Sequence, residues 1–181
     1  MIRVSSPRWA GFLDELDELL DDTFELHCVG GFAIVAAYGL PRSTNDLDYF
    51  TLIPFNRVQD LERIAGHGSA LARKHKVQVH LAAIASVPED YERRMTELFP
   101  QRFKHLRLFV LDAYDLVLSK LSRNVERDRE DVAHLARTCH LDGMILRDRY
   151  VAELRPILIG DARQHDLTLK FWIDAYFPPQ S

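Results

Sequence analysis

The 181-residue sequence has few cysteines and no long apolar run, and each absence excludes a class of protein. Its two cysteines, Cys28 and Cys139, are too few for a disulfide framework and suit a reducing compartment. No stretch reaches the roughly 18–20 uninterrupted apolar residues of a membrane-spanning helix. The first residues lack the basic region and apolar core of a secretory signal. We therefore expect a cytoplasmic protein that has no membrane partner.

The sequence also lacks an excess of basic residues, because 23 Lys and Arg stand against 27 Asp and Glu, a formal net charge of −4. This balance argues against strong nucleic-acid binding by the whole surface, although it leaves room for one local basic face. Two clusters, residues 73–76 and 102–107, are candidates for such a face, and solvated charges beside strands are the alternative. With 47% apolar and 28% charged residues, the composition is that of an ordinary folded domain.

The spacing of apolar residues predicts both helices and strands. Residues three or four positions apart predict helices over 9–20, 32–38, 56–73, 124–138, 143–154 and 161–176, with a short helix after Pro88. Short apolar or alternating runs predict strands over 24–29, 47–53 and 76–84. Residues 99–110 have room for two short strands, although Pro100 weakens that interpretation. From Asp112 onward the pattern is helical almost to the end.

This layout predicts an α+β fold, in which a small mixed β-sheet flanked by helices is followed by a helical C-terminal half. The α/β core would span residues 1–111, and residues 112–181 would form a helical part packed on it. No repeat, low-complexity segment or flexible linker separates the two parts, so we expect a single compact unit.

A pair of glycines, Gly30 and Gly31, stands between the first predicted strand and the helix that follows it. Glycines at this place leave backbone N–H groups bare at a helix N-terminus, where unpaired amides and the helix dipole favour a phosphate. The alternative is a tight turn with no ligand, which is the commoner role of a Gly-Gly pair.

Two carboxylates, Asp46 and Asp48, lie two positions apart on the next predicted strand, so their side chains point to one face. They repel each other unless a cation neutralises them, and Mg²⁺ prefers carboxylates together with phosphate oxygens. The alternative is a pair of solvated acids on a strand edge. In this order around a helix, the glycines and the carboxylates predict a nucleoside triphosphate held over Mg²⁺, with displacement at phosphorus as its chemistry.

Four motifs follow one another between about residues 26 and 138. They are Gly30-Gly31, Arg42-x-Thr44-x-Asp46-Leu47-Asp48, Lys120, and Asp128-x-x-Asp131. In this order they resemble the nucleotidyltransferase (polymerase-beta-like) superfamily. The closer resemblance is to its bacterial AbiEii-like branch, which includes the nucleotidyltransferase toxins of type IV toxin–antitoxin systems.

The resemblance implies a role for each matching residue. Gly30 and Gly31 would hold triphosphate oxygens, and Asp46 and Asp48 would be catalytic residues that ligate Mg²⁺. Lys120 looks like the helix lysine that contacts phosphate in this superfamily, and a solvated helix residue is the alternative. The list is completed by Arg42 and Thr44, which would touch phosphate or hold the loop, and by Asp128 and Asp131, of which Asp131 is the better candidate for a role near the acceptor or metal. Surface ion pairing with Arg127 and Arg129 is the alternative for these two acids.

One departure from the superfamily concerns the base for the incoming hydroxyl. Many members carry a third acid on a later strand, whereas the strand around Val77–Leu81 has no carboxylate and offers Gln78 or His80 near that place. His80 would be a base near neutral pH, and a buried, hydrogen-bonded histidine is the alternative. Three readings stay open: a role for Asp131, a nonacidic substitute, or loss of catalysis.

Two functions from different classes follow. The first is a Mg²⁺-dependent nucleotidyltransferase that moves a nucleoside monophosphate from an NTP to RNA (a tRNA, for example), protein or a small molecule. As a toxin it would have a small antitoxin protein as a further partner. The second is a catalytically silent module on the same fold that binds nucleotide or another protein.

Overall fold

The computed structural model describes residues 7–82, 86–159 and 161–177. The chain divides into two compact units. The sheet unit comprises residues 1–84 and 95–110, and the helical unit comprises residues 85–94 and 111–181. Among the described residues, no helix is both long enough and apolar enough to cross a membrane.

The sheet unit is built on five strands in the spatial order β3-β2-β1-β5-β4. Their bounds are β1 Phe24–Val29, β2 Asp46–Ile53, β3 Gln78–Leu81, β4 Thr96–Leu98 and β5 Leu106–Val110. The pairs β1–β5 and β2–β3 are parallel, whereas β1–β2 and β4–β5 are antiparallel. The expectation of a small mixed sheet is therefore confirmed.

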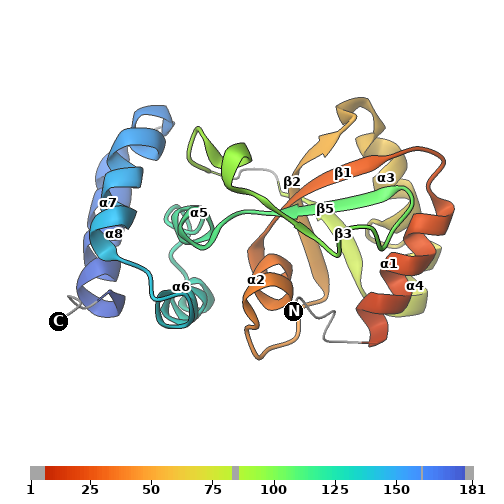
Figure 1. The fold of residues 1–181 in the computed structure, drawn as a ribbon, viewed down its shortest axis with the longest axis horizontal. Helices are drawn as coiled ribbons and strands as arrows, with labels where there is room; N and C mark the ends of the chain where they lie inside the picture. The colour runs from red at the N-terminus through yellow and green to blue at the C-terminus, as the bar shows by residue number, and fades with distance from the viewer. Residues whose placement is uncertain (1–6, 83–85, 160, 178–181) are drawn as a thin grey trace. The chain divides into compact units, whose positions relative to one another are not determined.

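Four helices complete the sheet unit: α1 Pro7–Leu19, α2 Gly30–Tyr38, α3 Val58–Ala65 and α4 Ala70–His75, with a 3₁₀ turn η1 at Phe55–Arg57. Helices α1, α3 and α4 pack against one another beside the sheet (Figure 1). Between these helices and the strands lies a core whose members are fully buried; it includes Phe12, Leu16, Leu26, Tyr49 and Leu108.

Helix α1 is fastened to the start of β5 by one carboxylate. The backbone N–H groups of Lys104, His105 and Leu106 donate to Asp17 over 2.9, 2.7 and 2.7 Å. Burial raises the pKa of Asp17, but these three donors outweigh burial and hold that pKa below its usual range. The carboxylate therefore stays ionised at neutral pH and fixes the end of the helix against the sheet.

Two predicted elements of the sheet unit need correction. The single helix over 56–73 is wrong, because Gly66 and Gly68 interrupt it and Ser69 caps a new helix by accepting the N–H of Ala72. The first of the two strands predicted within 99–110 is also wrong, because β4 ends at Leu98. Gly66 is the C-cap of α3, which ends at Ala65, and Gly68 takes a positive φ of 75° in the turn before Ser69.

The helical unit contains α5 Ala113–Leu118, α6 Glu126–Thr138, α7 Gly143–Arg149 and α8 Ala162–Tyr176, together with the 3₁₀ turns η2 Tyr91–Arg94 and η4 Arg155–Ile157. The helices expected near 124–138, 143–154 and 161–176 are confirmed, as is the short helix after Pro88. Helix α7 continues as the π-helical turn η3, Tyr150–Leu154. The core of this unit is fully buried and includes Leu116, Val132, Leu135, Leu146 and Trp172.

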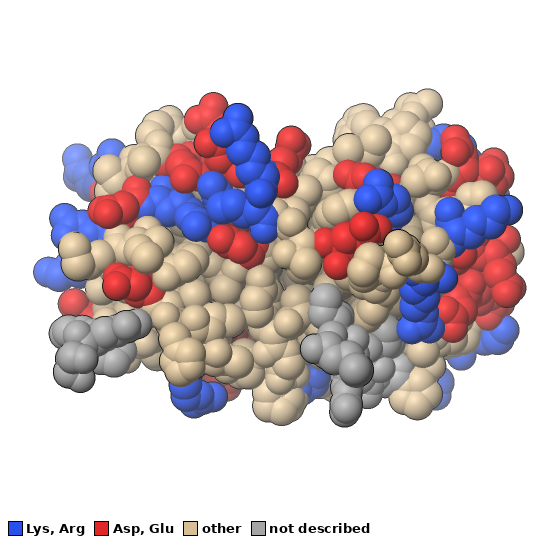
Figure 2. Space-filling view, viewed as in Figure 1, with Lys and Arg blue, Asp and Glu red and all other residues tan. Residues whose placement is uncertain are grey.

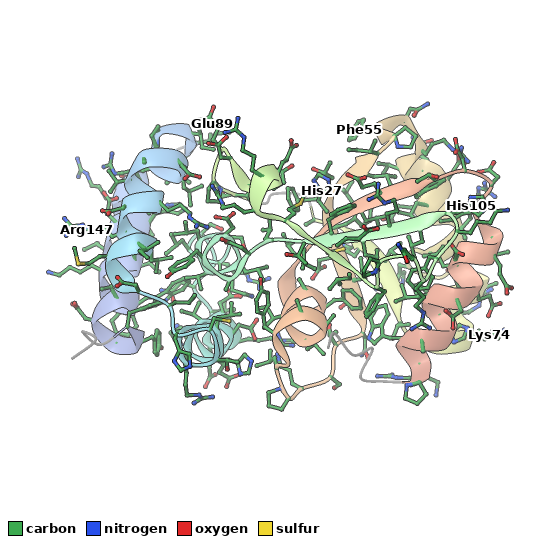
Figure 3. All side chains as sticks on the ribbon, in the orientation of Figure 1. His27, Phe55, Lys74, Glu89, His105 and Arg147 are labelled. Atoms are coloured by element: carbon green, nitrogen blue, oxygen red, sulfur yellow. The ribbon has the colours of Figure 1, made fainter. Side chains whose placement is uncertain are left out.

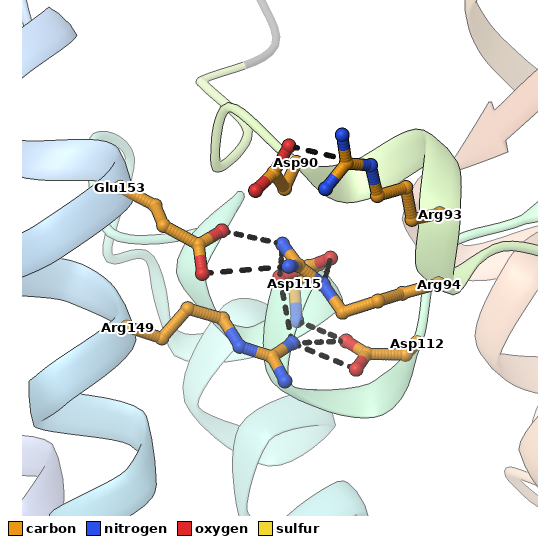
Figure 4. A network of polar contacts seen from close by, with 7 residues as sticks. All are labelled: Asp90, Arg93, Arg94, Asp112, Asp115, Arg149 and Glu153. Carbon is orange, nitrogen blue, oxygen red and sulfur yellow. Dashed lines mark hydrogen bonds and ion pairs between the residues drawn. The ribbon is translucent and has the colours of Figure 1, made fainter.

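A polar network ties η2 to the helices of this unit (Figure 4). Arg94 bonds both Asp115 on α5 and Glu153 on η3, at closest distances of 2.9 and 2.7 Å. Arg149 completes the network by bonding Asp112 and Asp115 over 2.7 and 2.9 Å. Burial and the neighbouring Asp112 raise the pKa of Asp115, whereas the two arginines lower it. These contacts join segments that are up to 59 positions apart in the sequence.

Candidate active site

The Gly-Gly pair forms the first two residues of α2, directly after β1 ends at Val29, so it lies at a helix N-terminus as its position in the sequence predicts. Gly30 has a φ of 69°, a conformation that side-chain-bearing residues rarely adopt. A Cβ atom at Gly30 would lie 2.5 Å from Oδ2 of Asp48. Glycine is therefore required twice, for the backbone conformation and for the close approach of the carboxylate.

Arg42 faces the second glycine. A Cβ atom at Gly31 would lie 3.0 Å from Nη2 of Arg42 and 3.1 Å from Nη1, so the guanidinium covers the start of α2. The residue before the helix, Val29, provides no side-chain cap. Backbone amides at a helix N-terminus beside a guanidinium are suited to an anion such as phosphate.

Asp46 and Asp48 lie on β2 and point to the same face, as the alternation of the strand predicts. In the parallel pairing with β3, Asp46 is opposite Gln78 and Asp48 is opposite His80. Gln78 Nε2 donates to Oδ1 of Asp46 over 2.9 Å, and His80 Nδ1 lies 3.2 Å from Oδ1 of Asp48. On the adjacent strand, Asp46 therefore has the neutral amide of Gln78 as its partner, and Asp48 has the titratable imidazole of His80.

The alternative reading of His80 as a buried histidine is wrong in one respect, because 60% of its side chain is exposed. It is nevertheless hydrogen-bonded, and its ring is accessible to solvent beside Asp48. Because a carboxylate only accepts, the contact requires a proton on Nδ1 and leaves Nε2 of a neutral ring as a base.

Thr44 holds the loop that leads into β2. Its hydroxyl donates to the backbone carbonyl of Asp46 over 3.2 Å, and its own carbonyl accepts the indole N–H of Trp9 over 3.1 Å. Thr44 is expected either to touch phosphate or to hold the loop, and these two contacts hold the loop.

Among the described residues, no group of three or more His, Cys, Asp or Glu side chains is arranged to hold a metal ion. The chemistry of the pair Asp46 and Asp48 still suits Mg²⁺, which is commonly bound by one or two carboxylates together with phosphate oxygens and water. Asp46 and Asp48 therefore suit a cation that is also bound by the phosphates of a nucleotide. They are less suited to a cation that only protein side chains would hold.

The other predicted site residues lie in the helical unit, where they form a buried cluster. Lys120 Nζ is 2.8 Å from Asp131 and 3.2 Å from Asp128, and Arg123 bonds Asp128 over 2.6 Å. Burial raises the pKa of Asp128, but Arg123 and Lys120 outweigh it and hold the pKa below its usual range. The side chains of Lys120, Asp128 and Asp131 are at most 4% exposed.

These positions differ from the expected ones in two ways. Lys120 is not on a helix, because α5 ends at Leu118, and it is not solvated. Asp128 pairs with Lys120 and Arg123 rather than with Arg127 or Arg129, whereas Asp131 pairs with Lys120. The two clusters belong to different units.

The basic clusters considered as polyanion-binding faces are partly ion-paired. Lys74 lies 2.6 Å from Glu15, Arg102 lies 2.8 Å from Asp14, and Arg107 is bonded to a glutamate on β4. Figure 2 shows Lys and Arg interspersed with Asp and Glu over the face in view. Neither cluster is therefore a bare basic surface.

Two features were missed or undervalued in the sequence. The sequence places Gln78 near the position of the third acid, but its role as the hydrogen-bond partner of Asp46 follows only from its register on β3. The network around Asp115 was also missed, although the acids at positions 112 and 115 are a visible helix-start signal.

Comparison with known families identifies the family to which the chain belongs. A family model described as "Nucleotidyltransferase of unknown function (DUF6036)" matches residues 11–174. The chain belongs to this family. Neither the curated proteins nor the solved structures gave a match to the chain. Family membership supports a nucleotidyltransferase, which would use an NTP, and it specifies no acceptor, metal, AbiEii-like branch or toxin–antitoxin role.

The close approach of Gly30 to Asp48 gives a test with a matched control. Gly30→Ala and Gly39→Ala both place a side chain at a φ near 68°, which costs about 1 kcal/mol in each. A Cβ atom at Gly39 meets nothing within 4 Å. We expect Gly30→Ala to lose about 1–3 kcal/mol more in urea unfolding, because it also displaces Asp48. Equal losses would show that Asp48 does not lie against this turn.

The buried ammonium of Lys120 gives a second test. Lys120→Met should lower the free energy of unfolding by about 3 kcal/mol or more, because two buried carboxylates lose their shared partner. Ser122→Ala changes an exposed residue of the same turn and serves as the control. Thermal and urea unfolding followed by circular dichroism measure both. A stable Lys120→Met protein would contradict the structural role of this lysine.

Proposed function

We propose that the chain is a Mg²⁺-dependent nucleotidyltransferase, which moves a nucleoside monophosphate from an NTP to a hydroxyl of RNA, protein or a small molecule. The observation that carries the proposal is the contact between the Gly30 turn and Asp48. It sets the amides that suit a phosphate directly against a carboxylate that suits the accompanying cation.

In this proposal the amides at the start of α2 and the guanidinium of Arg42 bind oxygens of the triphosphate. Asp46 and Asp48 hold Mg²⁺, which when bound neutralises charge on the reacting phosphate and on the leaving pyrophosphate. Thr44 and Gln78 keep Asp46 in place, because one fixes its backbone and the other its carboxylate.

The acceptor hydroxyl attacks the α-phosphorus while the bond to the β-phosphate oxygen breaks and pyrophosphate leaves. The hydroxyl proton goes to Nε2 of His80, which is free to accept it when Nδ1 donates to Asp48. This assignment gives the site a nonacidic substitute for the third acid. The roles that the resemblance implies for Lys120, Asp128 and Asp131 beside phosphate or acceptor stay predictions.

A silent nucleotide-binding or protein-interaction module is the second candidate function. It is favoured by one observation, which is that the β3 positions opposite Asp46 and Asp48 carry Gln78 and His80 instead of a carboxylate. No contact among the described residues bears on the toxin–antitoxin part of the resemblance, so a toxin activity and an antitoxin partner also stay predictions.

The test uses NTPs labelled either at the α- or at the γ-phosphate, with Mg²⁺ and total cellular RNA and protein. We expect transfer of the α-label alone, and a loss of at least about 100-fold in Asp46→Asn and in Asp48→Asn, because each removes a charge that holds the cation. Asp90→Asn, which changes an exposed acid of the helical unit, is the control.

Each outcome has a meaning. Label transfer that persists in both variants would overturn the metal assignment. Nucleotide binding with no transfer from any of the four NTPs would favour the silent module, and transfer of the γ-label would point to a different phosphoryl chemistry.

A further inference from the structure

One face of α7 and the adjoining η3 turn carries four side chains that the fold of the helical unit does not use. Met144, Arg147, Asp148 and Val151 follow one another at spacings of three, one and three residues, which places them on one side of a helix. They line a hollow of about 310 Å³ on the surface. Met144 is 75% exposed and Val151 is 53% exposed.

This hollow continues into a groove between α7–η3 and α8. A second hollow of about 500 Å³ shares Arg147 and Val151 with the first and is also lined by Leu169 and Ile173. The two hollows therefore adjoin each other, and apolar and charged side chains together line them. Met144 and Val151 are exposed apolar members of this lining, and exposed apolar residues gathered on one face mark an interaction site more often than scattered ones do.

Four charged side chains on this face are not ion-paired within the described part of the chain. Neither Arg147 nor Asp148 forms a salt bridge there, and the same holds for Lys170 and Asp174 on the α8 side of the groove. Figure 3 shows Arg147 pointing away from its helix into solvent. With the ion pair between Arg155 and Asp166, the lining carries three positive and three negative side chains, so it matches neither a polyanion nor a uniformly acidic peptide.

The order of these side chains along the helix identifies the occupant. It reads apolar, basic, acidic, apolar from Met144 to Val151. Read in the opposite direction, the order is apolar, acidic, basic, apolar, which is the complement of the first. An antiparallel copy therefore sets apolar against apolar and base against acid at every position, whereas a parallel copy would set Arg147 against Arg147.

We propose that this face is a two-fold interface between two copies of the chain. In it, Met144 of one copy packs against Val151 of the other, and Arg147 of one copy pairs with Asp148 of the other. An isologous interface needs this self-complementarity, because every contact is made twice. A helix pair with one flanking groove buries less area than a standard interface. We therefore expect a dissociation constant on the order of 10 μM for the dimer.

Sedimentation of the full chain across protein concentration tests the proposal. The wild type should move from 20.9 kDa toward twice that mass as the concentration rises. Arg147→Asp and Asp148→Arg alone should each weaken association at least about tenfold, because like charges then face each other. The double variant R147D/D148R restores opposite charges across the two-fold axis and should restore association.

Arg163→Asp reverses an exposed charge on α8 outside the groove and should sediment as the wild type does. Restoration by the double variant excludes misfolding as the cause of the single-variant losses. The proposal is overturned by a chain that stays monomeric throughout, by single variants that associate normally, or by a double variant that does not recover. A monomer that binds a different protein through this face would also overturn it. The nucleotide-transfer assay does not depend on any of these outcomes.

Discussion

Two like charges on one face of β2 are the constraint from which the rest of the site follows. Asp46 and Asp48 repel each other, and the surrounding residues offset that repulsion with hydrogen bonds from Gln78 and His80. Gly30 allows the backbone to come against Asp48 because it has no Cβ atom. In the proposed function, Mg²⁺ would offset the remaining charge of this pair, and the N-terminus of α2 beside it would take the phosphates that accompany the ion.

Acidic residues of the helical unit are used differently. Asp115, Asp128 and Asp131 are buried and bonded to arginine or lysine, so their charges are matched inside the unit. Buried pairs of this kind add little net stability, but removal of one member is costly. Asp46 and Asp48 are half-buried, and on the adjacent strand they contact Gln78 and His80. This contrast in burial supports the proposal that Asp46 and Asp48 carry the chemistry.

Much of the sheet unit could be predicted from the sequence, because β1, α2 and β2 are short and bounded by glycine and proline. The common face of Asp46 and Asp48 follows from the period of a strand. The pairing of β2 with β3 could not be predicted, because strand register depends on the packed sheet rather than on local pattern. The burial of Lys120 could not be predicted for a similar reason, because it depends on tertiary contacts with Asp128 and Asp131 on α6.

Calorimetric titration with an NTP analogue that cannot release pyrophosphate tests the central claim most directly. The account predicts binding to the wild type in the presence of Mg²⁺, and loss of that binding when Mg²⁺ is chelated or in Asp48→Asn. Gly39→Ala, which leaves the site untouched, should bind as the wild type does. Binding of equal strength without Mg²⁺, or in Asp48→Asn, would contradict the account, as would no binding at all.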